Sequence, residues 1–330
     1  MSTEDRLRAD VVALATRDGR CVGTPGHERA RAWLAATARR RGLLGYHGDR
    51  YELPYEDGDP DEDGGASLCN VLARAPGRSR TASPVLIAAH YDTCGMQPGA
   101  DDNAAAVAIS LECSRRLLER PAASDVVLAW FDAEEPPHFL GPSMGSTYFY
   151  HHQRVEDVRC ALVMDLVGHT VPIPERGELV FVTGAETDPA LPGVLARCPE
   201  GRLRVVPVRN AYVGDMSDHH VFRVERRPYL FLSCAQWEHY HRPTDTPFVL
   251  DYPKMAAIAD YVEALVRVLA EVELAGPFES RDTLELELAG ARRHLGGLAA
   301  LLNNRLATRA DLDALVRAAK ASFGLLDDGR

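Results

Sequence analysis

The sequence predicts an α/β fold, with a mostly parallel, twisted sheet flanked by helices on both faces and a helical extension at the C-terminal end. The first observation is that short apolar runs, typical of buried strands, alternate with helical patterns through most of the 330 residues. Such alternation favours parallel strands, because each crossover between them needs a connecting helix. The second observation is that the chain beyond about residue 280 carries helical patterns without a strand pattern.

Two helices are predicted before the sheet begins. Residues 4–17 place apolar side chains at helical spacing, and a second helix runs from about 27 to 41, where Gly42 ends it. Seven apolar runs are then predicted as strands: 68–73, 85–89, 126–131, 160–166, 179–183, 203–208 and 229–233. The helices predicted between and after them span 104–119, 145–153, 188–197, 217–225 and 252–273.

The character of the chain changes after Gly276. Residues 281–304 and 308–323 are predicted as helices with apolar stripes. We therefore predict a main domain over residues 1–275 and a helical C-terminal extension over 276–330. The extension packs either on its own domain or on a second copy of the chain, so a homo-oligomer formed through these helices is one expectation.

The composition excludes several classes of partner. A net charge of −11 argues against nucleic acid or an anionic membrane surface. No run approaches the ~20 apolar residues that a membrane span needs, and the charged N-terminal stretch lacks the apolar core of a signal peptide. The seven cysteines are scattered and form no CxxC pair, which favours reduced thiols in a cytoplasmic protein. Cys94 lies close to the candidate site described next, as either a packed or a reactive thiol.

Residues that can bind metal cluster near the ends of several predicted strands. They are His90 and Asp92 after strand 85–89, Asp101 and Asp102 in the next loop, Glu134 and Glu135 after strand 126–131, Asp165 at the end of strand 160–166, and His241 after strand 229–233. Because the carboxyl ends of parallel strands meet at one edge of a sheet, these places can converge. Asp165 stands out, since a carboxylate in an apolar run is costly to bury without a cation or metal. Jointly, imidazole and carboxylate groups of this kind suit one or two zinc ions.

The order and spacing of these residues resemble the M28 family of zinc aminopeptidases and its relatives, which include the glutaminyl cyclases. The resemblance covers about residues 20–270 and rests on short motifs. They are Gly23-Thr24-Pro25-Gly26, His90-Tyr91-Asp92, Gly99-Ala100-Asp101-Asp102-Asn103, Ala133-Glu134-Glu135, Met144-Gly145-Ser146, Met164-Asp165-Leu166, Ser217-Asp218-His219 and His241-x-x-x-Asp245-Thr246. The short gap between His90 and Asp102 separates the chain from M20-type metallopeptidases, in which the gap is longer and a lid domain is expected.

This resemblance makes residues 1–275 the catalytic domain and implies two zinc ions, with a single ion as the alternative. The implied ligands are His90 and Asp165 for one ion, Glu135 and His241 for the other, and Asp102 as the bridge, followed by a cis peptide bond. Asp102 is chosen over Asp101 because it lies in register with the family's bridging carboxylate. Glu134 would be the general base, and Asp92 would orient His90 by fixing its tautomer.

The chain departs from the family's pattern directly after the two glutamates. A proline-rich loop over residues 136–143 intervenes there and should reshape the substrate pocket. His138 in this loop is either a pocket residue or a structural one. The tyrosine that helps to stabilise the oxyanion in some members has no counterpart in register. The further candidate pocket residues are Tyr212 and Tyr240, as substitutes for that tyrosine, and Asp218, which is expected to shape the pocket rather than to bind metal.

The leading interpretation is a zinc-dependent aminopeptidase or amidase that acts on a peptide or small amide, cleaving an N-terminal residue or the amide bond. The alternative is a glutaminyl cyclase-like transferase with a single catalytic zinc, because residues 131–135 and 163–168 resemble the cyclase forms. A non-catalytic binding scaffold is a third interpretation. Residues 99–102 and 241–246 resemble the peptidase forms more closely and favour the hydrolase.

Overall fold

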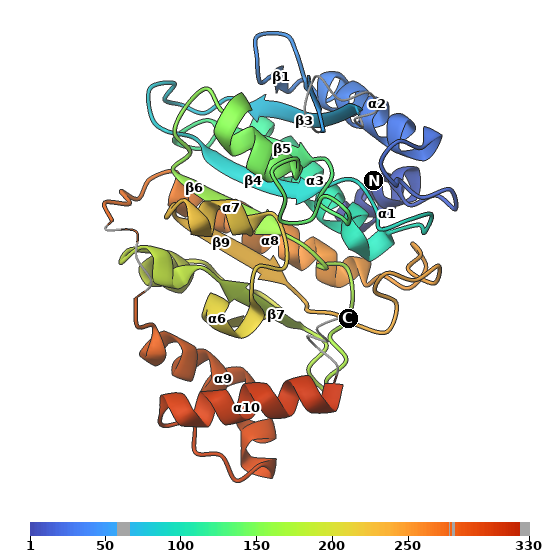
Figure 1. The fold of residues 1–330 in the computed structure, drawn as a ribbon. Coiled ribbons are helices and arrows are strands. Elements are labelled where there is room, and N and C mark those ends of the chain that lie inside the picture. The colour runs from blue at the N-terminus through green and yellow to red at the C-terminus, as the bar shows by residue number, and fades with distance from the viewer. Residues whose placement is uncertain (58–66, 277, 279–280, 324–330) are drawn as a thin grey trace.

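A nine-stranded sheet forms the centre of the protein in the computed structural model, which describes residues 1–57, 67–276, 278 and 281–323 (Figure 1). The strand order is β1-β3-β5-β4-β6-β9-β7-β8, and β2 pairs with β3 outside this path. The strands are β1 (Leu44–Gly45), β2 (Glu52–Glu56), β3 (Ser67–Ala75), β4 (Val85–His90), β5 (Val126–Phe131), β6 (Cys160–Met164), β7 (Leu179–Thr183), β8 (Arg204–Pro207) and β9 (Tyr229–Ser233).

The strand directions make the sheet mixed. The middle of the sheet, β5-β4-β6-β9, is parallel, as is the pair of β7 and β8. The strands β1, β2 and β5 run antiparallel to β3, and β7 runs antiparallel to β9. The predicted fold class is therefore confirmed, and its parallel part is the centre of the sheet.

Helices cover both faces of the sheet (Figure 1). The α-helices are α1 (Thr3–Leu14), α2 (Pro25–Arg40), α3 (Ala105–Glu119), α4 (Gly145–Tyr148), α5 (Leu191–Arg197), α6 (Asn210–Val213), α7 (His219–Val224), α8 (Tyr252–Leu269), α9 (Leu284–Leu301) and α10 (Arg309–Phe323). On one face α1, α3 and α8 enclose the larger apolar core with alternate residues of β3, β4 and β5, whereas α7 and the segment after α4 enclose a smaller core on the other face. Among the helices in the described ranges, none has the length and apolar content that crossing a membrane requires.

The central strands form where the sequence is apolar on both faces. All six residues of β4 and of β5 are buried, which matches the continuous apolar runs predicted for strands covered on two sides. The predicted strand 160–166 ends earlier, at Met164, and Leu166 adopts a positive φ of 52°. The two strands that the sequence analysis missed are β1 and β2, which are short and lie at the outer side of β3.

The C-terminal helices pack along the β8 edge of the sheet, at the far end of the strand order from β1 (Figure 1). Helix α9 contacts the edge strand β8, and α10 contacts α9. The start of α10 is held by reciprocal hydrogen bonds, because the Asp311 N–H donates to Thr308 Oγ1 and the Thr308 N–H donates to Asp311 Oδ2. The division of the chain into two domains and the homo-oligomer remain predictions.

Helix α1 is joined to α3 through a buried carboxylate. Glu112 is 1% exposed and accepts two hydrogen bonds of 2.8 Å from the Arg6 guanidinium, along with others from Arg115 and Arg116 of its own helix. Burial raises the pKa of Glu112, but these arginines outweigh burial and hold it at about 2. The charged form of Glu112 therefore stabilises the fold.

We expect Glu112→Gln to lower the free energy of unfolding by roughly 2–4 kcal/mol at neutral pH, because Arg6 loses its charged partner. Since the pKa in the folded state lies below the ordinary value, this contribution is complete above about pH 5 and shrinks as the pH falls toward about 2. Urea unfolding of both proteins between pH 7 and pH 3 measures it. Glu119→Gln, an exposed acid on the same helix, is the control and should change stability little. A difference between wild type and Glu112→Gln that does not change with pH would contradict the prediction.

Candidate metal centre

The predicted metal ligands and the predicted base come together at one edge of the sheet, the carboxyl ends of β4, β5, β6 and β9. They are His90 at the end of β4, Asp102 in the π-helical turn η1 (Ala100–Ala104), Glu134 and Glu135 after β5, Asp165 after β6, and His241 in the loop after β9. Register explains part of this arrangement. Ala88 of β4 pairs with Val163 of β6, so His90 and Asp165, two residues further along each chain segment, are brought side by side. A cis peptide bond joins Asp102 to Asn103.

His90 is the centre of one group. Its Nε2 atom lies 3.2 Å from an Asp102 oxygen and 3.6 Å from an Asp165 oxygen. A Glu134 oxygen lies 3.8 Å from the same nitrogen. All four side chains are buried. One imidazole nitrogen therefore faces three carboxylates at the distances found between ligands that share a metal ion.

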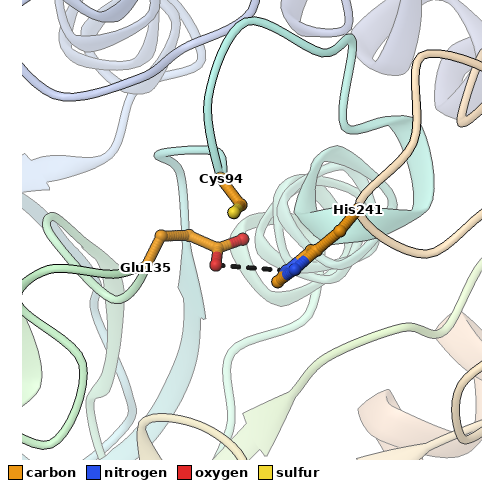
Figure 2. A group of neighbouring side chains, drawn as sticks. All are labelled: Cys94, Glu135 and His241. Carbon is orange, nitrogen blue, oxygen red and sulfur yellow. Dashed lines mark ion pairs between the residues drawn. The ribbon is translucent and has the colours of Figure 1, made fainter. Parts of the chain in front are cut away.

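His241 forms a second group with Glu135 and Asp102. Its Nε2 atom lies 3.2 Å from Glu135 Oε2 and 3.1 Å from Asp102 Oδ2. Asp102 therefore turns one oxygen toward each histidine, which is the arrangement that a bridging carboxylate requires. Cys94 lies beside this group, and Figure 2 shows it with Glu135 and His241 pointing toward one another.

The side chains present fit a zinc ion. Several of their buried polar atoms have no hydrogen-bond partner among the described residues. These atoms include His90 Nε2, Glu135 Oε1, Asp165 Oδ1 and His241 Nε2. Buried polar atoms normally have partners, and buried charges are normally paired or bind a metal. Nitrogen and oxygen donors that lie this close together are a typical ligand set for zinc.

Asp92 lies behind the cluster and positions two of its parts. Its Oδ1 is 3.3 Å from His90 Nδ1, on the side of the ring away from the other carboxylates. Its two oxygens also accept the backbone N–H groups of Glu134 and Glu135 over 3.1 and 3.0 Å. Burial raises the pKa of Asp92, but the interactions with His90 and with these two amides lower it by more. The net result is a pKa below the ordinary value, so Asp92 is held as a carboxylate. One buried group thus orients both the imidazole and the loop of the paired glutamates.

The electrostatics of the site are dominated by buried acid. Burial raises the pKa of Glu134 well above its ordinary value and that of Glu135 to about 7. Burial lowers the pKa of His90, but Glu134 and Asp165 outweigh it and raise that pKa well above its usual value. Carboxylates outnumber the imidazoles in both groups, which is a setting that a divalent cation stabilises.

The sequence analysis missed Arg20, a buried cation behind the site. Arg20 is 1% exposed, and its guanidinium donates to five backbone carbonyls. The shortest of these bonds go to Tyr91 (2.6 Å), Pro98 (2.6 Å) and Gly99 (2.9 Å). These bonds tie together the two ends of the loop that follows β4. Arginine is usually exposed, and nothing in the local sequence marks this one as buried.

Asp245, also without an assigned role in the sequence analysis, supports the turn that carries Asp102. It accepts the backbone N–H of Asp101 over 2.9 Å and that of Asp102 over 3.1 Å, and burial raises its pKa to about 8. The Asp101 side chain has other partners, since its two oxygens meet the Gly168 N–H and His169 Nδ1, each at 2.6 Å. Asp101 therefore points away from the two histidines that Asp102 faces.

The two candidate tyrosines lie in different surroundings. The ring of Tyr240 stacks on that of His241 at 3.8 Å between centroids, and Tyr240 lines a small cavity with Asp165. Burial and the nearby carboxylates raise the pKa of Tyr240, so its O–H group remains a donor. The Tyr212 hydroxyl instead donates to Asp313 of α10 over 2.6 Å. Tyr240 is therefore the one next to the metal ligands.

The other two candidate pocket residues are buried away from open space. His138 Nδ1 lies 3.2 Å from Asp57 Oδ2 and 3.2 Å from Ser143 Oγ, which ties the proline-rich loop to the end of β2. Asp218 is fully buried just before α7, and burial raises its pKa to about 7. Neither side chain belongs to the groups of possible metal ligands found in the described residues.

A buried cluster of histidines and carboxylates at the carboxyl edge of the central strands is an arrangement suited to binding a metal ion. The profile of peptidase family M28 matches residues 70–266. The chain belongs to peptidase family M28. A curated relative, the uncharacterized protein YfbL of Escherichia coli (strain K12), is 29% identical over 214 residues, which span 55% of this chain and 66% of that protein's length.

Several solved structures share the fold. A Zn-dependent exopeptidase from Parabacteroides distasonis has a TM-score of 0.63 and 16% identity, over 80% of this chain and 97% of that one. A glutaminyl cyclase from Porphyromonas gingivalis has a TM-score of 0.63 and 20% identity, over 81% and 98%. A leucine aminopeptidase precursor from Bacteroides thetaiotaomicron has a TM-score of 0.63 and 16% identity, over 80% and 96%. Exopeptidases and cyclases thus resemble the chain equally well in fold.

Proposed function

We propose that the chain is a zinc-dependent aminopeptidase or amidase that cleaves an N-terminal residue or a small amide. The observation that carries the proposal is the different placement of two adjacent glutamates. Glu135 pairs with His241 at 3.2 Å, whereas Glu134 reaches the His90 group, with 3.8 Å to the imidazole nitrogen. Hydrolysis needs such a pair, because one carboxylate binds metal while its neighbour stays free to move protons.

The zinc ligands in this proposal are the five side chains that face one another. They are His90, Asp102, Glu135, Asp165 and His241. Zinc, when bound, lowers the pKa of water and polarises a carbonyl group. Glu134 would accept the proton of the attacking water and return it to the nitrogen of the leaving amine. Asp92 would keep Glu134 in place through its backbone N–H.

Tyr240 would complete the reaction site. Tyr240 lines the small cavity that Asp165 also lines. Its raised pKa keeps the O–H group protonated, so it can donate a hydrogen bond to the carbonyl oxygen as negative charge develops there. The stacking of its ring on His241 would hold the hydroxyl in position.

A glutaminyl cyclase-like transferase with a single zinc is the second candidate. The fold similarity to a Porphyromonas gingivalis glutaminyl cyclase, at a TM-score of 0.63, favours it as much as the similarity to the exopeptidases favours hydrolysis. In this alternative only Asp102, Glu135 and His241 would hold the ion. The carboxylates beside His90 favour the hydrolase, because they supply a second set of donors.

Glu134→Gln should lower kcat/KM by roughly 10²- to 10⁴-fold without loss of bound zinc, because the amide cannot accept the proton. Glu135→Gln is the matched variant and should lose zinc, since its carboxylate pairs with His241. Zinc content by atomic absorption and activity should be measured on both proteins. Loss of zinc from Glu134→Gln alone would mean that the roles of the two glutamates are reversed.

A substrate panel separates the two candidate reactions. We expect the zinc-loaded protein to hydrolyse amino-acid anilides, to lose that activity on treatment with a chelator, and to regain it with added zinc. Two zinc ions per chain should accompany full activity. Intact anilides together with cyclisation of a peptide that begins with glutamine would refute the hydrolase and establish the cyclase.

A further inference from the structure

A thiol faces the His241 side of the metal centre. The Cys94 sulfur, a Glu135 oxygen and a His241 nitrogen all lie within 4.8 Å of one another, and the three side chains converge from separate loops (Figure 2). Glu135 is only 4% exposed, and its Oε1 atom has no hydrogen-bond partner among the described residues. Sulfur, nitrogen and oxygen donors are the three kinds of ligand that zinc takes from proteins.

The loop that carries Cys94 is held by buried hydrogen bonds. Thr93 Oγ1 accepts a hydrogen bond from the backbone N–H of Arg20 over 2.8 Å and donates one to the Gly95 carbonyl over 2.9 Å. The Arg20 guanidinium then binds the Pro98 and Gly99 carbonyls further along. Hydrogen bonds from Arg20 therefore hold the backbone on both sides of Cys94.

We propose that Cys94 is a further ligand of the zinc ion that Glu135 and His241 would hold, with Asp102 as the remaining ligand. On binding, the S–H bond breaks, a sulfur–zinc bond forms, and the proton is released to solvent. A thiolate makes this half of the centre favour zinc or cobalt over magnesium and manganese. It also fills the coordination of this half, which leaves room for water in the half that contains His90 and Glu134.

Cobalt substitution tests this ligand directly. The protein loaded with Co²⁺ should show a near-ultraviolet band from charge transfer between thiolate and cobalt, and Cys94→Ser should lose that band while still binding cobalt. Cys21→Ala is the matched control, because Cys21 and Cys94 are the two half-buried cysteines of the chain. Bound cobalt without the band in wild type would overturn the proposal, and so would failure to bind cobalt at all.

Thiol labelling gives a second readout that does not depend on activity. In Cys21→Ala, a thiol reagent should label Cys94, and added zinc should slow this labelling at least about tenfold, in keeping with the cost of losing a metal contact. In Cys94→Ser, labelling of Cys21 should not respond to zinc. Equal labelling rates with and without zinc in Cys21→Ala would exclude Cys94 as a ligand.

A second, independent feature is an apolar cavity under the C-terminal helices. The volume of this cavity, measured as the space open to the centre of a water-sized sphere, is about 90 Å³. On the same measure a single trapped water needs roughly 10–15 Å³. The cavity can therefore hold a group of several carbon atoms. Its walls are apolar side chains from the sheet edge and from both helices, among them Phe181, Val206, Leu295, Leu312 and Leu315. The family match ends at residue 266, before both helices begin.

This cavity adjoins the metal centre. A smaller cavity of about 30 Å³ is lined by Asp165 and Tyr240, and it shares four wall residues with the larger one. The shared residues are Val213, Phe231, Ser233 and Ala235. The two spaces therefore adjoin each other at these four residues.

Part-buried polar contacts fix the two helices over the cavity to each other and to α6. Arg309 of α10 donates to Glu287 of α9 over 2.7 and 2.8 Å, and Tyr212 of α6 donates to Asp313 of α10 over 2.6 Å. Glu287 is 1% exposed, so its contacts with Arg309 are largely shielded from solvent. The cavity thus has a fixed roof.

We infer that the cavity receives a long apolar side chain of the substrate, whose amide bond would lie at the metal centre. This inference rests on the proposed hydrolase function and adds the substrate class, an amide of an amino acid with an extended aliphatic side chain. When an apolar group is transferred from water to an apolar cavity, each methylene group raises the binding affinity by about three- to fourfold.

Chain-length dependence tests the inference. Across anilides of alanine, norleucine and 2-aminooctanoic acid, kcat/KM should rise by about that factor per methylene group. Ala319→Trp, which fills the cavity from α10, should abolish the rise. Ala314→Trp, an exposed position on the same helix, is the matched control. A rise that persists in Ala319→Trp would overturn the inference.

A binding measurement separates this failure from failure of the proposed function. Octylamine should raise the Tm of wild type and Ala314→Trp more than ethylamine does, and Ala319→Trp should remove the difference. If no anilide is cleaved but the octylamine effect follows this pattern, the hydrolase proposal fails and the apolar site stands. If wild type shows neither a chain-length rise nor the octylamine effect, the cavity does not receive an aliphatic chain.

Discussion

Burying several carboxylates within a few ångströms of one another is the constraint on which the rest of this structure depends. Each of them is costly to bury unless donors or cations meet its oxygens. Asp92 and Asp245 are each met by two backbone N–H groups. Asp102 is met by two imidazoles. The carboxylate oxygens left without partners among the described residues include Glu135 Oε1 and Asp165 Oδ1, whose side chains point into the cluster, and both oxygens of the buried Asp218. A large part of the unmatched negative charge thus lies where a zinc ion would be held.

The topology of the sheet brings one part of this cluster together, and the loops that follow the strands supply the rest. His90 pairs with Phe131, and β4 and β5 end at these two residues. Glu134 and Glu135 follow Phe131 by three and four residues, so a single turn of the chain brings them to His90. Asp165 comes from β6 by register alone. The fixed parts therefore come from parallel strands, whose ends are held by hydrogen bonds on both sides. Asp102 and His241 come from loops and require separate support, which Asp245 gives to the first of them.

The sequence alone predicted what depends on local pattern. The continuous apolar runs located β4 to β6, and the polar residues that follow them located the edge where the site lies. It did not predict Arg20, because four of the five carbonyls that bind this arginine lie 71 to 82 residues further along the chain. The sequence analysis missed β1 and β2 for a similar reason, because these strands are short and form by pairing with β3. Cys94 was located beside the site, but its direction is set by tertiary hydrogen bonds of the loop.

The two inferences about this chain concern the two halves of the metal centre, and different observations carry them. A thiolate from Cys94 would fill the half that contains Glu135 and His241, so water and substrate would be confined to the half that contains His90. That half is also the one beside Asp165, which lines the small cavity next to the apolar space under the C-terminal helices. A substrate bound there would place its amide beside Glu134 and its side chain toward α10. In these two proposals, the ligand set would decide where the reaction occurs, and the helices after the family's matched region would decide which side chain fits.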